Sequence, residues 1–136
     1  MTHELGFEVR LNEPYDEAVE KVVAALKVEG FGVLTRIDVR AVLQEKLGQE
    51  FRPYVILGAC NPSLSHRALS SDPEVGLVLP CNVTVEADPQ GGSLVRIVNP
   101  EVMMEVGALG ENPEVSDVAR VAREKLERVA GALQEA

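Results

Sequence analysis

The chain has 136 residues, 46% of them hydrophobic, which is enough to bury one core without disulfide or metal support, so we expect a single domain over residues 1–136. Its 13 lysines and arginines are outnumbered by 22 aspartates and glutamates, and this net charge of −9 without a basic run argues against nucleic acid and anionic membranes as partners. There is no signal-like N-terminus and no run of about eighteen apolar residues, so the cytoplasm is the expected location.

The N-terminal part of the chain shows a strand, a helix and a second strand. Residues 5–11 alternate apolar and polar side chains, which is typical of a strand with one solvent-exposed face. Pro14 suits the first turn of an amphipathic helix, and Gly30 provides its stop. Residues 31–37 then predict a strand that returns to the same sheet.

A short helix and a third strand follow. Asp38 is expected to cap a helix with one apolar side that ends at Gly48, and residues 51–57 predict a strand. Gly58 removes side-chain bulk near the end of this strand, so we expect another part of the chain to pack closely there.

The second half begins with two helix starts and a hairpin. Asn61-Pro62 opens about two helical turns, and Asp72-Pro73 opens one more. Residues 77–87 and 93–98 predict two antiparallel strands joined by a turn at residues 88–92.

Two helices are expected to close the chain. Residues 101–106 predict a short helix, and residues 115–133 carry a regular apolar stripe that must lie on the sheet or on a partner. The expected fold is α+β, with a mainly antiparallel sheet of about five strands, helices packed on one face, and the order β-α-β-α-β-α-β-β-α.

The candidate site is formed by two Cys-Asn corners, each at or within an apolar strand. If the two strands share a sheet, the corners meet at one end and enclose a pocket, with the Cα atoms of the cysteines about 10 Å apart. In a reducing compartment we expect free thiols and no disulfide. The candidate ligand-binding residues are Cys60, Asn61, His66, Pro80, Cys81 and Asn82.

A soft or borderline metal ion is one possible ligand of this site. Cys60, Cys81 and His66 are ligand types that Zn²⁺ or Cu⁺ selects, and His66 could turn back from its helix toward Cys60. Met103 and Met104 could add soft sulfur ligands or form the lip of a pocket, although methionines more often fill gaps in a core. The simplest alternative is that both thiols only pack as small hydrophobic groups.

A thiol-dependent enzyme is another possibility, with Cys60 or Cys81 as nucleophile or redox group. Cys60 precedes a helix start, where free N–H groups and the helix dipole stabilise a thiolate. Asn61, as the expected cap, would satisfy the same N–H groups and leave Cys60 as a packing residue. No phosphate-loop, dinucleotide, nucleophile-elbow or zinc-protease motif names a reaction.

Several motifs together resemble those of the domain of unknown function 302 family, and the resemblance covers nearly the whole chain. They are Leu57-Gly58-Ala59-Cys60-Asn61-Pro62, His66-Arg67-Ala68-Leu69, Asp72-Pro73, Val75-Gly76-Leu77, Leu79-Pro80-Cys81-Asn82-Val83 and Asn99-Pro100 with Met104. The resemblance implies an α+β domain of bacteria and archaea that forms a homodimer, and it implies no reaction.

The expected function is therefore a cytosolic, homodimeric domain that binds or senses a small molecule or a soft metal at the Cys60 and Cys81 corners. A dimeric interaction module without ligand is a further alternative. Self-association is expected because residues 115–133, 55–57 and 77–79 offer more apolar surface than one thin sheet layer covers.

Overall fold

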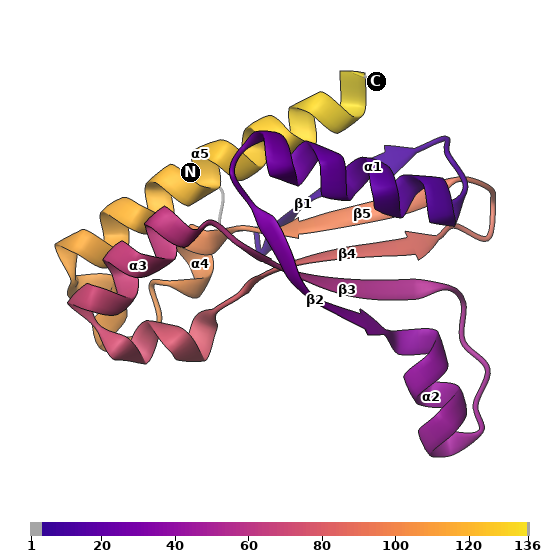
Figure 1. Cartoon of the computed structure of the whole chain (residues 1–136), viewed down its shortest axis with the longest axis horizontal. Helices are drawn as coiled ribbons and strands as arrows, with labels where there is room; N and C mark the ends of the chain where they lie inside the picture. Colours follow the sequence, from indigo (N-terminus) through magenta and orange to yellow (C-terminus); the bar gives the residue numbers. More distant parts are fainter. Residues whose placement is uncertain (1–3, 136) are drawn as a thin grey trace.

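Five strands form one sheet in the computed structural model, which describes residues 4–135 (Figure 1). The strands lie in the order β1-β5-β4-β3-β2, and every neighbouring pair is antiparallel. The expected α+β fold with a five-stranded antiparallel sheet is thus confirmed. The strands are β1 Gly6–Leu11, β2 Gly32–Asp38, β3 Tyr54–Cys60, β4 Cys81–Ala87 and β5 Ser93–Val98.

The helices occupy three places around the sheet (Figure 1). Helices α1 and α5 pack on one face, whereas α3 and α4 gather at one end together with two short 3₁₀ helices, η1 and η2. Helix α2 projects from the opposite end. The helices are α1 Tyr15–Val28, α2 Val39–Leu47, α3 Pro62–Ser71, η1 Pro73–Val78, α4 Pro100–Met103, η2 Gly107–Glu111 and α5 Pro113–Glu135.

The apolar stripe of α5 lies inside the chain's own core. Its members pack with α1 and with the inward side chains of the strands. Burial of apolar surface at about 25 cal/mol per Å² makes this layer the main source of stability. The stripe is therefore not available to a partner, which removes one reason for expecting a dimer. Its buried residues are Val115, Val118, Ala122, Leu126, Val129 and Leu133.

The structure corrects three predicted boundaries. The third strand begins at Tyr54, just after Pro53, instead of at residue 51, and the short helix predicted at 101–106 is Pro100–Met103. The fourth strand begins at Cys81, because residues 73–78 form a 3₁₀ helix and Pro80 stands directly before the strand. Proline has no N–H to donate to a strand ladder, so the ladder starts only after Pro80.

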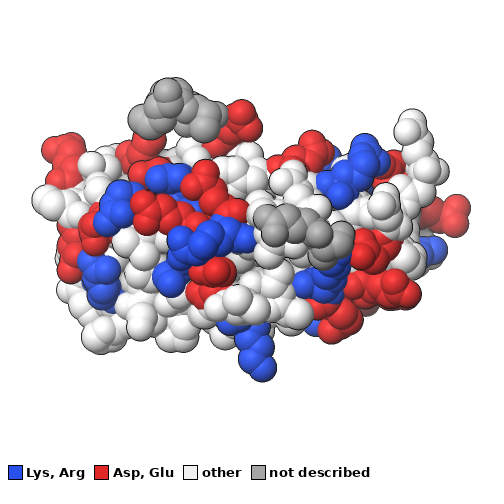
Figure 2. Space-filling model, turned by 90° about the horizontal axis from the view of Figure 1, so that it is seen from above, with Lys and Arg blue, Asp and Glu red and all other residues white. Residues whose placement is uncertain are grey.

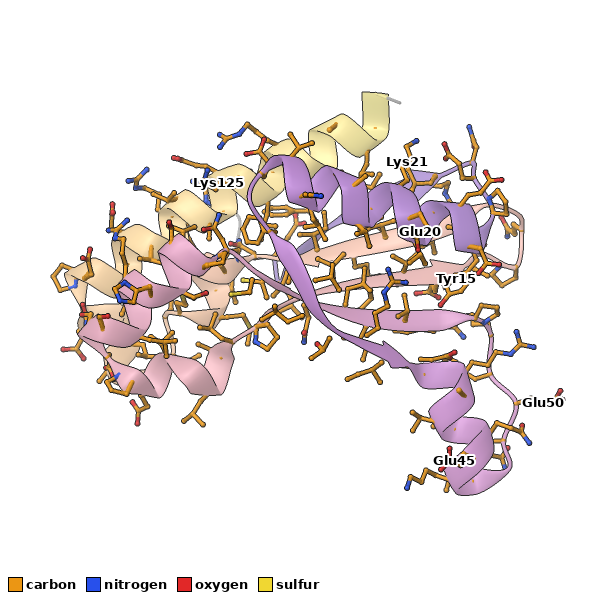
Figure 3. All side chains as sticks on the ribbon, viewed as in Figure 1. Tyr15, Glu20, Lys21, Glu45, Glu50 and Lys125 are labelled. Atoms are coloured by element: carbon orange, nitrogen blue, oxygen red, sulfur yellow. The ribbon has the colours of Figure 1, made fainter. Side chains whose placement is uncertain are left out.

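Residues 32–52, which we call the arm, comprise the edge strand β2, helix α2 and the segment that returns to β3. The Asp38 carboxylate accepts a hydrogen bond from the Ala41 N–H at 3.0 Å, and Gly48 ends α2 with a φ of 64°, as the sequence predicted. Helix α2 nevertheless buries none of its residues, so its apolar side is not covered. Glu45 and Glu50 lie at the far end of the arm, away from α1 and α5 (Figure 3). The exposed apolar side chains of the arm are Leu34 (68%), Ile37 (46%), Val42 (43%) and Leu47 (66%).

Acidic and basic side chains are mixed over the surface seen from above in Figure 2. Many of them form ion pairs, such as Arg120 with Asp117 and Glu124 along α5. Among the helices of residues 4–135, none combines the length and the apolar character that crossing a bilayer requires.

Candidate functional site

The two cysteines lie at the same end of the sheet. Cys60 is the last residue of β3, and Cys81 is the first residue of β4. In the antiparallel pairing of these strands Ala59 lies opposite Cys81, so the cysteines are diagonal neighbours. Both are free thiols. The structure thus brings together two residues that are far apart in the sequence.

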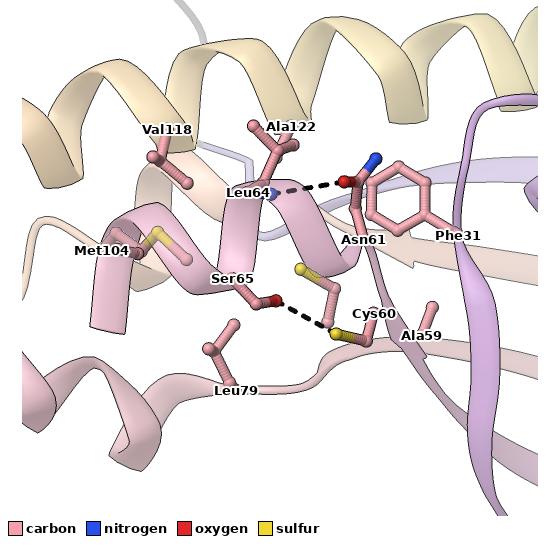
Figure 4. A pocket seen from close by; sticks show the side chains of 12 residues that line it. Phe31, Ala59, Cys60, Asn61, Leu64, Ser65, Leu79, Met104, Val118 and Ala122 are labelled. Carbon is pink, nitrogen blue, oxygen red and sulfur yellow. Dashed lines mark hydrogen bonds between the residues drawn. The ribbon is translucent and has the colours of Figure 1, made fainter. Parts of the chain in front are cut away.

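A small cavity lies between these strand ends and the helices α3 and α5 (Figure 4). Cys60 and Cys81 line it together with Ser65 and Met104, and apolar side chains such as Leu64 complete most of the wall. Its volume is about 20 Å³, which is room for about one water molecule. Among the described residues that line it, none carries a charged side chain or an imidazole.

Asn61 supports the site by holding the start of α3. Its Oδ1 accepts a hydrogen bond from the Leu64 N–H at 3.3 Å, and its Nδ2 donates to the Glu29 carbonyl at 3.3 Å. The side chain is buried, and it lines the cavity as well. Both its polar atoms are engaged within the chain, so the structure supports a capping role for Asn61 more directly than a role as ligand.

Ser65 lies at the candidate site, although no sequence motif indicates it. Its Oγ lies 3.0 Å from the Cys60 Sγ (Figure 4). With Asn61 as the N-cap, Cys60 is the residue before the cap and Ser65 is the fourth residue of the helix. Side chains at these two positions regularly meet at helix starts, so the cap itself was the signal that could have identified Ser65.

The environment of Cys81 favours the protonated thiol. Burial, and to a smaller extent the nearby Cys60, raises the pKa of Cys81 to about 11. At neutral pH a group with this pKa is mainly a protonated thiol, which disfavours Cys81 as a nucleophile.

His66 does not reach the site. It is exposed on α3 and does not line the cavity of the two cysteines. Of the predicted metal set, the structure brings Cys60 and Cys81 together but does not place His66 beside them. Within residues 4–135, no group of three or more His, Cys, Asp or Glu side chains is arranged to hold a metal ion.

Pro80 and Asn82 lie on the other side of Cys81. Both are exposed, and they line a second cavity of about 40 Å³, which Cys81, Met103 and Met104 also border. Asn82 follows Cys81 in an extended strand, so its side chain points to the face of the sheet that α1 and α5 leave open. These two predicted residues therefore belong to a neighbouring surface and not to the cavity of Cys60.

The close packing expected at Gly58 is present. A Cβ atom at this position would collide with the Thr35 Oγ1 and would lie 2.8 Å from the Pro80 Cγ. Gly58 lies opposite Thr35 in β2 and opposite Asn82 in β4. The glycine therefore allows three segments to meet next to the cysteine corner.

A buried carboxylate on the open face of the sheet was not foreseen from the sequence. The Glu86 side chain is 6% exposed and accepts hydrogen bonds from the Arg52 Nε at 2.7 Å and from Arg96. Burial alone raises the pKa of Glu86, but the hydrogen bonds from the two arginines outweigh it and leave this pKa below its usual value. This ion-paired group stabilises the open face.

Two comparisons with known proteins indicate the same family. The family model described as "Domain of unknown function DUF302" matches residues 7–133. A crystal structure of an uncharacterised conserved DUF302 protein from Bacillus stearothermophilus is similar, with 29% identity, a TM-score of 0.82, and coverage of 95% of this chain and 98% of that one. A comparison with curated proteins finds no match.

Proposed function

We propose that this chain, which belongs to the DUF302 family, is a homodimeric domain that binds a small, soft ligand, above all a metal ion, between Cys60 and Cys81. The observation that carries this proposal is that two thiols from separate strands line one cavity. Soft metal ions prefer thiolate ligands to hard oxygen ligands. Free thiols also fit a reducing compartment, and the cytoplasm is the location that we propose.

The size of the cavity favours an ion over a metabolite. Pockets for organic ligands usually measure about 300–1,000 Å³. The cavity at Cys60 measures about 20 Å³, so a ligand of one or a few atoms fits it without a rearrangement of the surrounding helices.

Binding is better supported than thiol catalysis. A nucleophilic cysteine needs a thiolate, which a neighbouring base or positive charge normally provides. Among the described lining residues no acid, base or histidine fills this role, and the partner of Cys60 is the neutral hydroxyl of Ser65. The raised pKa of Cys81 also opposes thiolate formation. A metal ion avoids this difficulty because coordination itself displaces the thiol proton.

The test is thermal unfolding of the reduced protein with and without Cd²⁺, a thiophilic probe. A site-specific ligand at 100 times its dissociation constant stabilises the folded state by about 2.7 kcal/mol. We expect this stabilisation in the wild type and its loss in Cys60→Ser and in Cys81→Ser. Circular dichroism of the metal-free variants serves as the folding control. Equal stabilisation of the wild type and of both folded cysteine variants would disprove the proposed binding site.

Self-association is supported by the arm more than by the stripe of α5 or the run at residues 55–57; of the third predicted surface, residues 77–79, Leu77 is exposed. The stripe of α5 and residues Val55 and Leu57 are buried within the chain. The edge strand β2 pairs only with β3, and its own side chains Leu34 and Ile37 are exposed. An identical strand related by a two-fold axis can pair with such an edge and cover its apolar side chains.

The charge distribution also favours contact through the arm. Residues 32–52 contain four basic and three acidic side chains, a net charge of +1, so the remainder of the chain carries −10. Two copies therefore repel each other least where their arms meet. This makes a second copy of the chain the occupant that we propose for the arm.

Sedimentation analysis at micromolar concentration tests the dimer. We expect a dimer for the wild type and a monomer for Ile37→Glu, which places a charge on the free edge strand. Leu77→Glu is the matched control, because Leu77 is 83% exposed and lies in η1, outside the arm. A wild-type monomer, or an Ile37→Glu variant that remains dimeric, would contradict the assignment.

Nucleic acid is not among the partners that we propose. The net charge of −9 repels phosphate, and a binding protein would need a basic surface that releases counterions. The mixed charges in Figure 2 agree with this proposal for the face shown there.

A further inference from the structure

The sulfur-containing side chains of the described chain gather at one place. Residues 4–135 contain two cysteines and two methionines, and all four line two small cavities. The inner cavity is lined by Cys60, Cys81 and Met104. The outer cavity is lined by Cys81, Met103 and Met104. Cys81 and Met104 border both, so they lie in the wall that separates the two cavities.

We propose that the inner cavity is a Cu⁺ site, with thiolate ligands from Cys60 and Cys81 and a thioether ligand from Met104. This inference rests on the proposed function and names its ligand. Two S–H bonds are replaced by two Cu–S bonds, and the two protons pass to solvent. The copper stays in the +1 state throughout, so binding needs no oxidant.

The set of donors distinguishes Cu⁺ from Zn²⁺. Structural zinc sites almost always have four ligands from cysteine, histidine and carboxylate side chains. Among the described lining residues of the inner cavity, cysteine is the sole member of that group, because His66 is exposed elsewhere on α3. A thioether is a soft donor that suits Cu⁺, and an ion with few ligands fits a volume of about 20 Å³.

The surroundings can stabilise the anionic site that results. A Cu⁺ ion with two thiolates carries a net charge of −1. The Ser65 hydroxyl is placed to donate a hydrogen bond to the Cys60 thiolate, with the two atoms 3.0 Å apart. Cys60 also immediately precedes the ten-residue helix α3, whose dipole favours negative charge at its start.

Met104 can adjust its position to the ion. It is buried at the end of α4, where its N–H donates a hydrogen bond to the Pro100 carbonyl at 2.9 Å. The backbone is therefore fixed, whereas the unbranched side chain has three rotatable bonds that can move the sulfur toward the cysteines. In Figure 4 Ser65 lies between Met104 and Cys60, so the Met104 sulfur must move toward the cysteines to coordinate the ion.

The test is Cu⁺ competition between the full-length protein and bicinchoninate under ascorbate, without thiol reductants. We expect the wild type to take up one Cu⁺ per chain. Met104→Leu should weaken the affinity by at least roughly tenfold, the smallest loss typical of a disturbed metal coordination sphere. Met103→Leu is the matched control, because Met103 lines the outer cavity and not the inner one. X-ray absorption should count three sulfur neighbours in the wild type and two in Met104→Leu.

The outcomes separate this inference from the proposed function. If Cys60→Ser abolishes Cu⁺ uptake but Met104→Leu matches the wild type in affinity and sulfur count, the role of Met104 is refuted and the binding site stands. If Met103→Leu weakens binding as much as Met104→Leu, the inner cavity is also the wrong location. If folded Cys60→Ser and Cys81→Ser both retain wild-type Cu⁺ affinity, the inference and the proposed function fall together.

Discussion

Replacement of Gly58 by alanine tests the packing beside the cysteine corner. The new Cβ atom would meet the Thr35 Oγ1 and the Pro80 Cγ, the latter at 2.8 Å, where ordinary contacts begin at 3.4 Å. The proline ring cannot rotate away, and a new rotamer of Thr35 would not relieve the contact with Pro80. Either strand β2 or the segment before β4 must therefore shift.

Two opposing effects determine how much Gly58→Ala lowers the free energy of unfolding. Overpacking of a well-packed site costs about 1–3 kcal/mol. Replacing glycine by alanine returns about 0.4–1 kcal/mol through the unfolded state wherever the backbone permits it. With the middle of each range, the net destabilisation of Gly58→Ala is about 1 kcal/mol. Gly32→Ala is the matched control in neighbouring strand β2, because no atom lies within 4 Å of its new Cβ. It should leave stability unchanged or slightly raised.

Urea unfolding at one fixed protein concentration measures both variants. With a slope of about 1–3 kcal/mol per molar urea, the Gly58→Ala midpoint should fall by roughly 1 M while the Gly32→Ala midpoint does not fall. The interpretation is refuted if the two variants unfold at the same midpoint. Adding Thr35→Ala to Gly58→Ala should recover only part of the loss, because the contact with Pro80 remains.

Three further predictions concern side chains near the site and on the open face. The folded-state pKa of Glu86 lies below the usual 4.5, so its ion pairs stabilise the protein above about pH 4.5 and lose this effect as the pH falls through the folded-state pKa. Urea unfolding at several pH values should therefore show a flatter dependence of stability on acid pH for Glu86→Gln than for the wild type, and an unchanged dependence would contradict the assignment. Asn61→Ala should lower the unfolding free energy by about 1–2 kcal/mol through loss of the cap on Leu64, and a loss below about 0.3 kcal/mol would argue against the cap. Iodoacetamide at pH 8 should label half-buried Cys60 before Cys81, with equal labelling of both in urea; faster native labelling of Cys81 would refute the raised pKa.

Most of the fold could be predicted because the ends of its elements carry local chemical signals. Asp38 caps α2, Asn61 caps α3, and Gly30 and Gly48 adopt the positive φ that ends a helix. The turn at residues 88–92 likewise predicts the hairpin that β5 forms with β4. Such signals act over a few residues, so a sequence shows them without a structure.

Features that depend on distant contacts could not be predicted in this way. The apolar run at residues 77–79 fits a strand, but residues 73–78 form a 3₁₀ helix under the Asp72 cap. His66 lies on α3 as expected, yet the phase of the helix turns it outward and brings Ser65 to Cys60 instead. The sequence indicates both cysteines as candidate site residues because each stands beside an asparagine, Cys60 at the end of a predicted strand and Cys81 within one. That the two cysteines share a cavity could not be predicted, because it depends on the register of β3 against β4.

The shape of the arm has a consequence for hydrogen exchange. Helix α2 has nine residues and buries none of them, and helices shorter than about 12–15 residues are marginal in water. Its amide hydrogens therefore exchange through local opening, whereas those of the central strand β4 exchange only through global unfolding. If two arms hold each other in the dimer, opening of α2 is coupled to dissociation. Protection of the α2 amides from exchange then rises with protein concentration, so exchange in this one helix measures dimer formation.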